Sequence, residues 1–185
     1  YLHRIYGAEG DGFEPIVASG PRGALPHARA SDRRVRKGEL VTIDFGCRFR
    51  GYHSDITRTV AVGKPSERLK KMYRAVLDAQ LASLLVIRAG LPARAADAES
   101  RRVLRSHRLL QHFRHSLGHG LGLQIHEQPR LAPTSPDILR DGQVVTVEPG
   151  VYVPGVGGVR IEDDIVVRPH GRDLLTTLPK ELIVL

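Results

Sequence analysis

The stretch VTIDFGCRFRGYHSDITRTVAVG, residues 41–63, contains the pattern around which the chain is organised. Apolar and polar residues alternate on both sides of Gly51, with the period of a β-strand that has one buried and one free face. Gly51 can take a positive φ without steric cost, so we expect residues 48–51 to form a tight turn between two strands. The apolar residues on one face of this predicted hairpin are Val41, Ile43, Phe45, Ile56, Val60 and Val62.

Two acids face each other in this hairpin. If the turn is centred between Phe49 and Arg50, Asp44 lies directly opposite Asp55. Cross-strand partners are roughly 4.5–5.5 Å apart at Cβ, and two like charges at that separation repel each other. A cation between the two carboxylates would remove the repulsion. The facing acids are therefore the first indication of a metal site.

The composition is that of a globular chain with one domain. The chain has 185 residues, of which 41% are hydrophobic and 26% charged, and this length is enough to bury a sizeable core. No apolar run reaches the roughly 18 residues that span a membrane. A single cysteine, Cys47, excludes an internal disulfide and fits a reducing, cytoplasmic compartment. We expect Cys47 to be a buried neutral thiol rather than a ligand.

The net charge of +8 raises the question of nucleic-acid binding. The basic residues are scattered in small clusters, and aromatic residues make up only 5% of the chain. Basic patches interleaved with stacking aromatic side chains are missing, so the sequence argues against nucleic acid as the main partner. A solvated basic surface accounts for the charge.

The rest of the chain is predicted to alternate between strands and two helices. Residues 65–89 show helical periodicity with Ser66 as the N-cap and Gly90 closing the helix. Its expected buried stripe is Leu69, Met72, Tyr73, Val76, Leu77, Leu81, Leu84 and Leu85. A second helix is expected at about residues 93–109. Further strands are predicted at residues 13–19, 143–148 and 158–168.

The two halves of the chain resemble each other. Residues 38–44, GELVTID, match residues 142–148, GQVVTVE, position by position, and an acid ends each segment. Glu148 and Glu162 are symmetric about Gly155, as the first pair of acids is about its own turn. A histidine precedes each segment, namely His27 and His126. We interpret this as a duplicated hairpin unit whose halves face each other across a pseudo-two-fold axis.

Four converging carboxylates need a compensating cation. The predicted set is Asp44, Asp55, Glu148 and Glu162, with His119 as the imidazole that completes it. Oxygen and nitrogen donors favour a hard or borderline divalent ion, manganese or cobalt above zinc, and argue against copper(I). Five ligands with two shared carboxylates fit two ions about 3.5–4 Å apart, which would activate a water for attack on a carbonyl.

Other readings of these residues stay open. The acids could instead be solvated ends of the hairpins. His53 lies on the Asp55 side of its strand, but a turn histidine is the simpler interpretation. Asp163 points away from Glu162, and Asp164 is interpreted as structural rather than as a ligand.

Eight motifs together resemble the pita-bread metallopeptidase family, which contains methionine aminopeptidase, aminopeptidase P and prolidase. They are IVASG (16–20), LPHA (25–28), IDFG (43–46), GYHSDITRTV (51–60), HSLGHGLG (115–122), HEQP (126–129), TVEPGVY (146–152) and GVRIEDD (158–164). Three of them, GYHSDITRT, TVEPGVY and GVRIEDD, resemble the proline-specific branch, that of Xaa-Pro aminopeptidase and prolidase, more than the methionine branch.

The resemblance implies an α+β pita-bread (creatinase/aminopeptidase) fold, with two pseudo-symmetric αβ halves around a curved antiparallel sheet covered by helices. Residues 1–185 would form the catalytic domain, without the N-terminal domain of the proline-specific branch and without the first helix of the catalytic fold. Those absences leave oligomer contacts and substrate-length selectivity undefined.

The resemblance also implies a role for each candidate residue. Asp44 would chelate one metal, His119 and Glu148 the other, and Asp55 and Glu162 would bridge both. Glu148 would relay a proton from water to the leaving amine. The supporting residues would be His27, His115 and His126 around the oxyanion, Arg160 beside the metal ligands, and Arg130 at a substrate carboxylate.

The implied function is that of a dinuclear-metal exopeptidase, with manganese preferred and cobalt or zinc as alternatives. It would hydrolyse the N-terminal Xaa-Pro bond of a short peptide, as an Xaa-Pro dipeptidase or aminopeptidase P, and form a homodimer. The alternatives are a methionine aminopeptidase, a creatinase-like hydrolase and a non-catalytic pita-bread module that binds peptides or proteins. A module of that kind would have lost ligand positions, and all five are present here.

Overall fold

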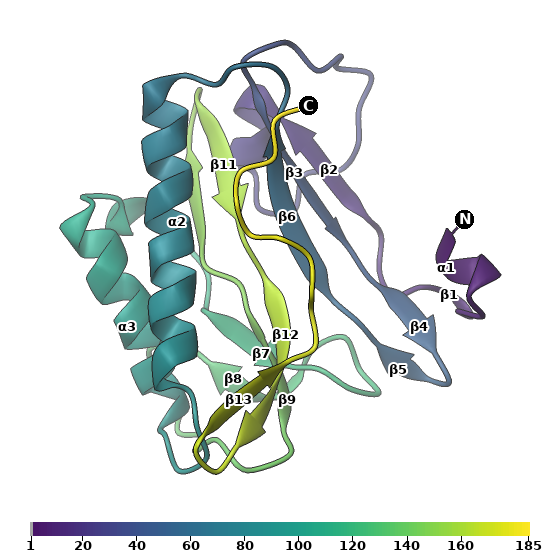
Figure 1. The fold of residues 1–185 in the computed structure, drawn as a ribbon, viewed down its shortest axis with the longest axis vertical. Helices are drawn as coiled ribbons and strands as arrows, with labels where there is room; N and C mark the ends of the chain where they lie inside the picture. Colours follow the sequence, from purple (N-terminus) through teal and green to yellow (C-terminus); the bar gives the residue numbers. More distant parts are fainter. Residues whose placement is uncertain (1) are drawn as a thin grey trace.

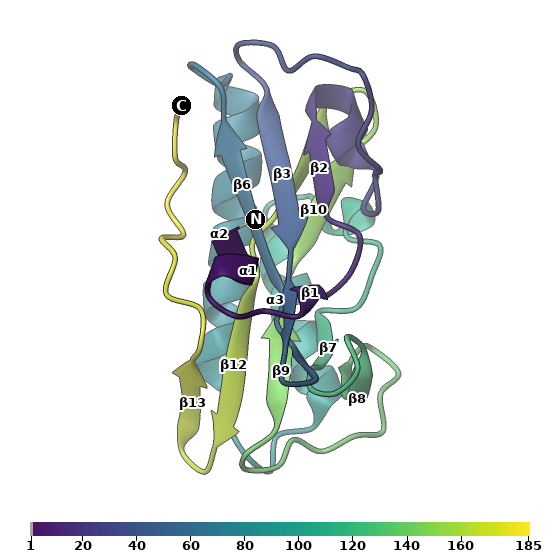
Figure 2. The same cartoon turned by 90° about the vertical axis from the view of Figure 1, so that its right-hand side faces the viewer.

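The computed structural model describes residues 2–185 and contains helices and antiparallel strands (Figures 1 and 2). The helical elements are α1 (Leu2–Ile5), η1 (Gly20–Ala24), α2 (Glu67–Val86), α3 (Ala93–Ser106) and η2 (Leu110–His112). The strands are β1 (Gly10–Asp11), β2 (Ile16–Ser19), β3 (Leu40–Phe45), β4 (Cys47–Phe49), β5 (Tyr52–His53), β6 (Ile56–Ala61), β7 (Gly118–Gly120), β8 (Glu127–Leu131), β9 (Val144–Val147), β10 (Gly150–Val153), β11 (Gly157–Arg160), β12 (Asp163–Arg168) and β13 (Gly171–Leu174).

Helix α2 begins where the sequence predicts. The Ser66 hydroxyl accepts a hydrogen bond from the Leu69 amide at 3.4 Å, as an N-cap does. The helix ends at Val86, before the predicted Gly90. Leu81 and Leu85 are exposed, so their place in the predicted stripe is wrong. The 3.6-residue period carries the buried face through polar positions instead, where Gln80 donates to Asp163 and Ser83 to Ala96.

The first hairpin has a different register from the one predicted. Its turn is centred on Arg50 and Gly51, both with positive φ (50° and 81°), as a two-residue type I′ turn requires. Asp44 consequently pairs with Thr57 and not with Asp55. The turn centre lies one residue later than predicted, so each residue of β3 pairs with a residue two positions further along the chain. Because side chains alternate with a period of two, every side chain stays on its predicted face. Asp55 is thus a diagonal neighbour of Asp44 on the same face.

The second hairpin keeps the predicted centre at Gly155. Gly150 pairs with Arg160, and Val147 pairs with Asp163, so the register is continuous through the ribbon. The predicted single strand over residues 158–168 is in fact two strands, β11 and β12, separated by a break that contains Glu162. Each half of the molecule therefore contains one long hairpin, β3–β6 or β9–β12, whose strands are interrupted midway.

The structure confirms the internal repeat. Strands β2, β3 and β6 form a three-stranded sheet, and β7, β9 and β12 occur in the same order within the five-stranded sheet β13-β12-β9-β7-β8. Gly38 and Gly142 both have positive φ, +87° and +81°. Their amides donate to the equivalent carbonyls of Val62 and Val167. The equivalence thus extends to single backbone hydrogen bonds.

The buried face of the first hairpin is the polar one. Thr42, Asp44, Thr57 and Thr59 are all buried, whereas Phe45 is exposed. In most alternating strands the apolar face is the buried one. Here the polar face is buried because it packs against the neighbouring strand β11. The Thr42 hydroxyl donates to the Gly158 carbonyl, and the Thr59 hydroxyl bonds to the Arg160 backbone. Polar side chains are buried here because they have partners.

The helices cover the second half of the molecule. The α2 and α3 helices lie side by side on one face of the sheet (Figure 1). A core of buried residues joins them to β8, β9 and β12. The C-terminal residues run along the outer edge of β6 (Figure 2), where Val184 forms a parallel bridge with Ala61. No helix in the described residues 2–185 is long and apolar enough to cross a membrane.

Candidate metal centre

The predicted acids gather at the breaks in the two ribbons. Asp55 lies between β5 and β6, Glu148 between β9 and β10, and Glu162 between β11 and β12, while Asp44 is the penultimate residue of β3. At such a break, the regular hydrogen bonds between the paired strands are interrupted. The carboxylates of both halves can therefore turn toward the same space between the ribbons.

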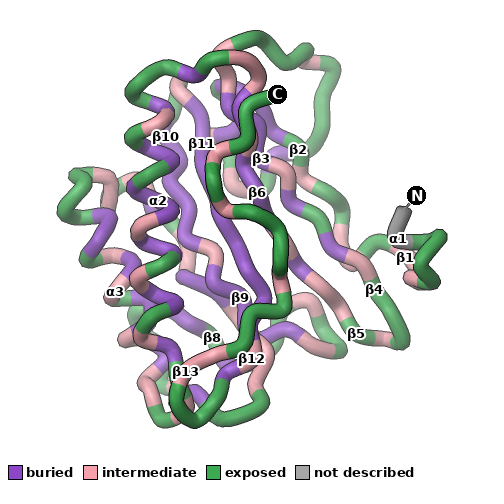
Figure 3. Tube along the Cα trace, viewed as in Figure 1, coloured by how far each residue is buried: buried purple, intermediate pink, exposed green. Residues whose placement is uncertain are grey.

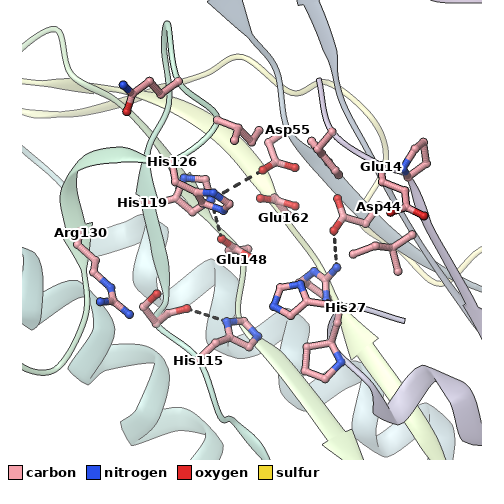
Figure 4. A pocket seen from close by; sticks show the side chains of 18 of the residues that line it. Glu14, His27, Asp44, Asp55, His115, His119, His126, Arg130, Glu148 and Glu162 are labelled. Carbon is pink, nitrogen blue, oxygen red and sulfur yellow. Dashed lines mark hydrogen bonds and ion pairs between the residues drawn. The ribbon is translucent and has the colours of Figure 1, made fainter. Parts of the chain in front are cut away.

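A single cavity of about 1030 Å³ contains the site. It is lined by every candidate residue: Asp44, Asp55, His119, Glu148 and Glu162 of the predicted metal set, and His27, His115, His126, Arg130 and Arg160. Figure 4 shows the acids converging on the space between His119 and Asp44. The structure thus brings together all the residues that the sequence nominates.

The carboxylates and the imidazole are close enough to share an ion. Nε2 of His119 lies 3.2 Å from Oε1 of Glu148 and 3.8 Å from Oδ2 of Asp55. One ligand atom each from Asp55, His119 and Glu162 lie within 4.8 Å of one another. Asp44 lies on the other side of the group and is paired with Arg160.

Arg160 joins the first hairpin to the second. Its guanidinium donates to Oδ2 of Asp44, to the hydroxyls of Thr57 and Tyr152, and to the Pro26 carbonyl. The last of these contacts fixes the residue before His27. Burial opposes the charge of Arg160, but Tyr152 and the nearby carboxylates outweigh it and raise the pKa of the guanidinium. The arginine is therefore a permanent cation at the edge of an acidic cluster.

Tyr152 is a site residue that the sequence analysis does not single out, although it lies within the TVEPGVY motif. Its hydroxyl accepts from Arg160 at 2.7 Å and lies 2.9 Å from Nε2 of His115. Nδ1 of His115 lies 2.8 Å from the Ser116 carbonyl, which only accepts. These partners fix the neutral tautomer with hydrogen on Nδ1. Burial also lowers the pKa of His115, consistent with a neutral ring.

The remaining candidates lie around the same cavity. The rings of His119 and His126 meet edge to face with centroids 4.3 Å apart. Burial, followed by the nearby charge of His119, lowers the pKa of His126. Arg130 pairs with His119 across β7 and β8, so the two residues are neighbours on adjacent strands. Figure 4 shows Arg130 on the far side of the cavity from Asp44.

The clustered acids perturb one another. Burial, together with the charges of Asp44 and Glu148, raises the pKa of Asp55 to about 9. Burial and the charge of Asp55 also raise the pKa of Glu162. Glu148 behaves differently: burial favours its neutral form, but the hydrogen bond with His119 lowers its pKa overall. Without a cation, the cluster is short of positive charge.

Two carboxylate oxygens at the cavity are available to a cation. Oδ1 of Asp44 and Oε1 of Glu162 are buried and have no hydrogen-bond partner among the described residues. Buried carboxylate oxygens without partners are costly, and divalent ions are the usual partners of such groups. Together with His119, these acids form a donor set that suits manganese, cobalt or zinc. The residues present therefore fit the predicted metal pair.

Asp164, which the sequence analysis interprets as a structural residue, contacts a candidate ligand directly. Its Oδ2 accepts the Asp55 amide at 3.0 Å, so it supports a predicted ligand from behind. Burial raises the pKa of Asp164 to about 7. Asp163 points away from the cavity, as predicted, and is paired with Arg58 and Lys180.

Two other residues considered from the sequence lie outside the cavity lining. Cys47 is half-buried with its Sγ 3.5 Å from the Ser54 hydroxyl, so the fully buried thiol expected is not observed. His53 uses its backbone amide to contact Gly122 at 2.8 Å. Neither residue lies where it could join the five candidate ligands.

Comparisons with known proteins agree with this geometry. A model of metallopeptidase family M24 matches residues 1–169. The chain is 45% identical over 183 residues to the Xaa-Pro dipeptidase of Pyrococcus horikoshii and 51% identical over 185 residues to the uncharacterized peptidase YqhT of Bacillus subtilis. These alignments cover 99% and 100% of this chain but 52% of each relative. The chain spans about half the length of the curated relatives it matches.

Solved structures give the same result. An Xaa-Pro dipeptidase from Bacillus anthracis matches with a TM-score of 0.97 and 53% identity, covering 98% of this chain and 51% of that one. An X-Pro aminopeptidase from Thermotoga maritima matches with a TM-score of 0.97 and 43% identity, covering 100% and 53%. The α+β pita-bread fold predicted from the sequence is thereby confirmed. The chain belongs to metallopeptidase family M24.

Proposed function

We propose that the protein is a metal-dependent exopeptidase that releases the N-terminal residue from peptides with proline in the second position. The observation that carries the proposal is the convergence of four acids and His119 on one cavity, with buried carboxylate oxygens that have no partner. Relatives whose names specify Xaa-Pro dipeptidase activity support the choice of substrate.

Two divalent ions would be held by the five candidate ligands. Asp44 would bind one ion, His119 and Glu148 the other, and Asp55 and Glu162 would bridge them. Manganese is preferred, with cobalt or zinc as alternatives, because the set is dominated by carboxylate oxygens. Such a pair, when bound, polarises a substrate carbonyl and lowers the pKa of water.

Glu148 is the candidate acid–base group. It lines the cavity and lies 3.2 Å from His119, which helps to keep its carboxylate ionised at neutral pH. In the proposed reaction Glu148 takes a proton from the attacking water as the oxygen bonds to the scissile carbon. It then gives that proton to the proline nitrogen as the carbon–nitrogen bond breaks.

The histidines would act on the carbonyl oxygen. His27 and His126 line the cavity and are the imidazoles proposed to donate to the developing oxyanion. Both ring nitrogens of His115 have protein partners, so its proposed contribution is to form the cavity wall and hold Tyr152. Arg160 would orient Asp44, and Arg130 would bind the carboxylate of a short substrate.

Three features of the protein's context belong to the same proposal. We propose a cytoplasmic location, a homodimeric state and short peptides as substrates. The single free cysteine fits a reducing compartment. Gel filtration with light scattering would measure the oligomeric state.

The decisive assay compares three peptides. Protein treated with a chelator and dialysed is given Mn²⁺ and then incubated with Ala-Pro, Ala-Pro-Ala or Met-Ala, with product amino acids measured. We expect cleavage of one or both proline peptides and none without metal. Cleavage of Met-Ala alone would favour a methionine aminopeptidase. No cleavage of any peptide, despite metal binding, would favour a non-catalytic module.

A further inference from the structure

Two buried threonine hydroxyls, one in each half of the molecule, lie directly behind two of the candidate ligands. Oγ1 of Thr57 is 2.7 Å from Oε2 of Glu162. Oγ1 of Thr146 is 3.1 Å from Oε1 of Glu148. Both threonines are completely buried, so neither hydroxyl can exchange its partner for bulk water.

The other partners of these hydroxyls determine where their hydrogens point. Thr57 receives the Nε–H of Arg160 at 3.0 Å, and Thr146 receives the backbone N–H of His119 at 3.1 Å. Guanidinium N–H and backbone N–H groups only donate, so each hydroxyl accepts on that side. Each therefore has its single hydrogen free for a carboxylate oxygen. Arg160 and the His119 backbone thus orient the two threonines, and the threonines orient the two glutamates.

One oxygen of Glu162 is engaged in this way while the other has no partner. Oε2 accepts from Thr57, and Oε1 is buried without a hydrogen bond. A carboxylate fixed at one oxygen has its rotation restricted, which presents the second oxygen in a fixed direction. Groups that hydrogen-bond to a metal ligand in this manner orient it and strengthen metal binding.

We propose that Thr57 and Thr146 are positioning residues that hold Glu162 and Glu148 in the orientation needed to bind the two metal ions. The inference rests on the proposed metal-dependent function. It predicts that removing either hydroxyl weakens metal binding even though neither threonine contacts the ions.

Thr42 provides a matched control within the same fold. It holds the place in the first half that Thr146 holds in the second, two residues before the acid that ends the repeated segment. Its hydroxyl bonds to the Thr59 hydroxyl and the Gly158 carbonyl rather than to a carboxylate of the acid cluster. Thr42→Val thus removes a buried hydroxyl without removing a carboxylate contact.

The experiment measures Mn²⁺ binding to chelator-treated protein by isothermal titration calorimetry, with thermal unfolding of the metal-free protein recorded in parallel. We expect Thr57→Val and Thr146→Val to weaken Mn²⁺ binding by about 10–100-fold. Thr57→Ser and Thr146→Ser should restore most of the affinity because they keep the hydroxyl. Thr42→Val should lower the unfolding temperature while leaving Mn²⁺ affinity close to that of the unaltered protein.

Activity with Ala-Pro at saturating Mn²⁺ gives a second readout. The two valine variants should lose kcat more than they raise KM, because the substrate is not their partner. Folded valine variants that bind Mn²⁺ as tightly as the unaltered protein would overturn the proposal. So would serine variants that fail to restore binding. If one valine variant fails to fold, Mn²⁺ binding by its serine variant and by the variants of the other threonine still tests the proposal.

The same titration separates this inference from the proposed function. Mn²⁺ binding that depends on the hydroxyls, without cleavage of any peptide, would overturn the reaction and leave the positioning role standing. Failure of the unaltered protein to bind Mn²⁺ would overturn both.

Discussion

The two halves of the molecule share a strand pattern but differ in what covers them. In the covered half (β7, β9 and β12), Val145, Val147 and Ile165 are completely buried under α2 and α3. In the open half (β2, β3 and β6), Val17 is 46% exposed and Phe45 is 38% exposed. Figure 3 shows β9 buried along most of its length and the far end of the first hairpin, β4 and β5, exposed or partly exposed. Ile43 and Val60, which correspond to Val147 and Ile165 in the repeat, are only partly buried, so equivalent residues have unequal burial.

The difference shows that period-two alternation identifies a strand but not its buried face. In the open half the polar face is the buried one, because β11 and the acid cluster lie against it. In the covered half the apolar face is buried as well, because the helices lie on its outer side. The positions of the carboxylates thus depend on the inner faces of both halves. The free energy of unfolding depends more on the covered half.

The first test compares one substitution in each half. Ile165→Ala in the covered half should lower the free energy of unfolding by about 2–5 kcal/mol, because it leaves a cavity in a closed core. Ile43→Ala in the open half should cost less than half as much, since Ile43 is only partly buried. Chemical denaturation of both variants measures the difference. Equal losses would contradict the contrast between the halves.

The second test concerns the charge that both halves contribute. Burial raises the pKa of Asp55 to about 9 in the folded metal-free protein, against an ordinary value of 3.8. The folded state therefore holds more protons than the unfolded state between these values, so stability falls as pH rises through this window. One such group would lower the free energy of unfolding by up to about 4 kcal/mol as the pH rises from 5 to 8.

Thermal unfolding of metal-free protein at several pH values measures this effect. Asp55→Asn, which cannot ionise at this position, should give a shallower pH dependence. Added Mn²⁺ should raise the unfolding temperature of the unaltered protein most at the higher pH. A metal-free protein whose stability rises steadily from pH 5 to pH 8 would show that the acids are not crowded in this way.

The third test weakens an ionic cluster that connects both halves to the C-terminal segment. Asp163 of the covered half is completely buried and bonds to Arg58 of the open half, to Gln80 of α2 and to Lys180 of the C-terminal segment. Lys180→Met removes one cation and leaves the other two partners. We expect a loss of about 1–3 kcal/mol by chemical denaturation. A change below about 0.5 kcal/mol, which is the level of an ordinary surface substitution, would mean that the ammonium contributes little.

The smallest effect is expected on the outer surface of α2. Lys70 pairs with Glu67 at 2.8 Å, and both side chains are largely exposed. Lys70→Ala should change the free energy of unfolding by no more than about 0.5 kcal/mol. The same denaturation measurement checks it, and a loss as large as that of Lys180→Met would be inconsistent with the burial difference between the two pairs.

Some of this organisation could be predicted from single residues. The repeat is predictable because Gly38 and Gly142 occupy equivalent positions, and the second register because Glu148 and Glu162 are symmetric about Gly155. The first register was missed because Arg50 takes a positive φ, which is uncommon for a residue with a Cβ.

Other features depend on tertiary contacts that no local pattern encodes. The burial of Gln80 in place of Leu81 depends on Asp163, which is 83 positions away along the chain. The contacts of Tyr152 and Asp164 with the site depend on neighbours from other strands. The motif residues could be nominated from sequence, but the groups that orient them could not.

The central claim is that acids from both halves and His119 enclose two divalent ions. Elemental analysis of protein loaded with Mn²⁺ and then dialysed tests it most directly, with Asp55→Ala measured alongside. We predict two ions per chain in the unaltered protein and loss of metal together with turnover in Asp55→Ala. Metal-free protein after loading, or an Asp55→Ala variant that keeps two ions and full activity, would contradict the account.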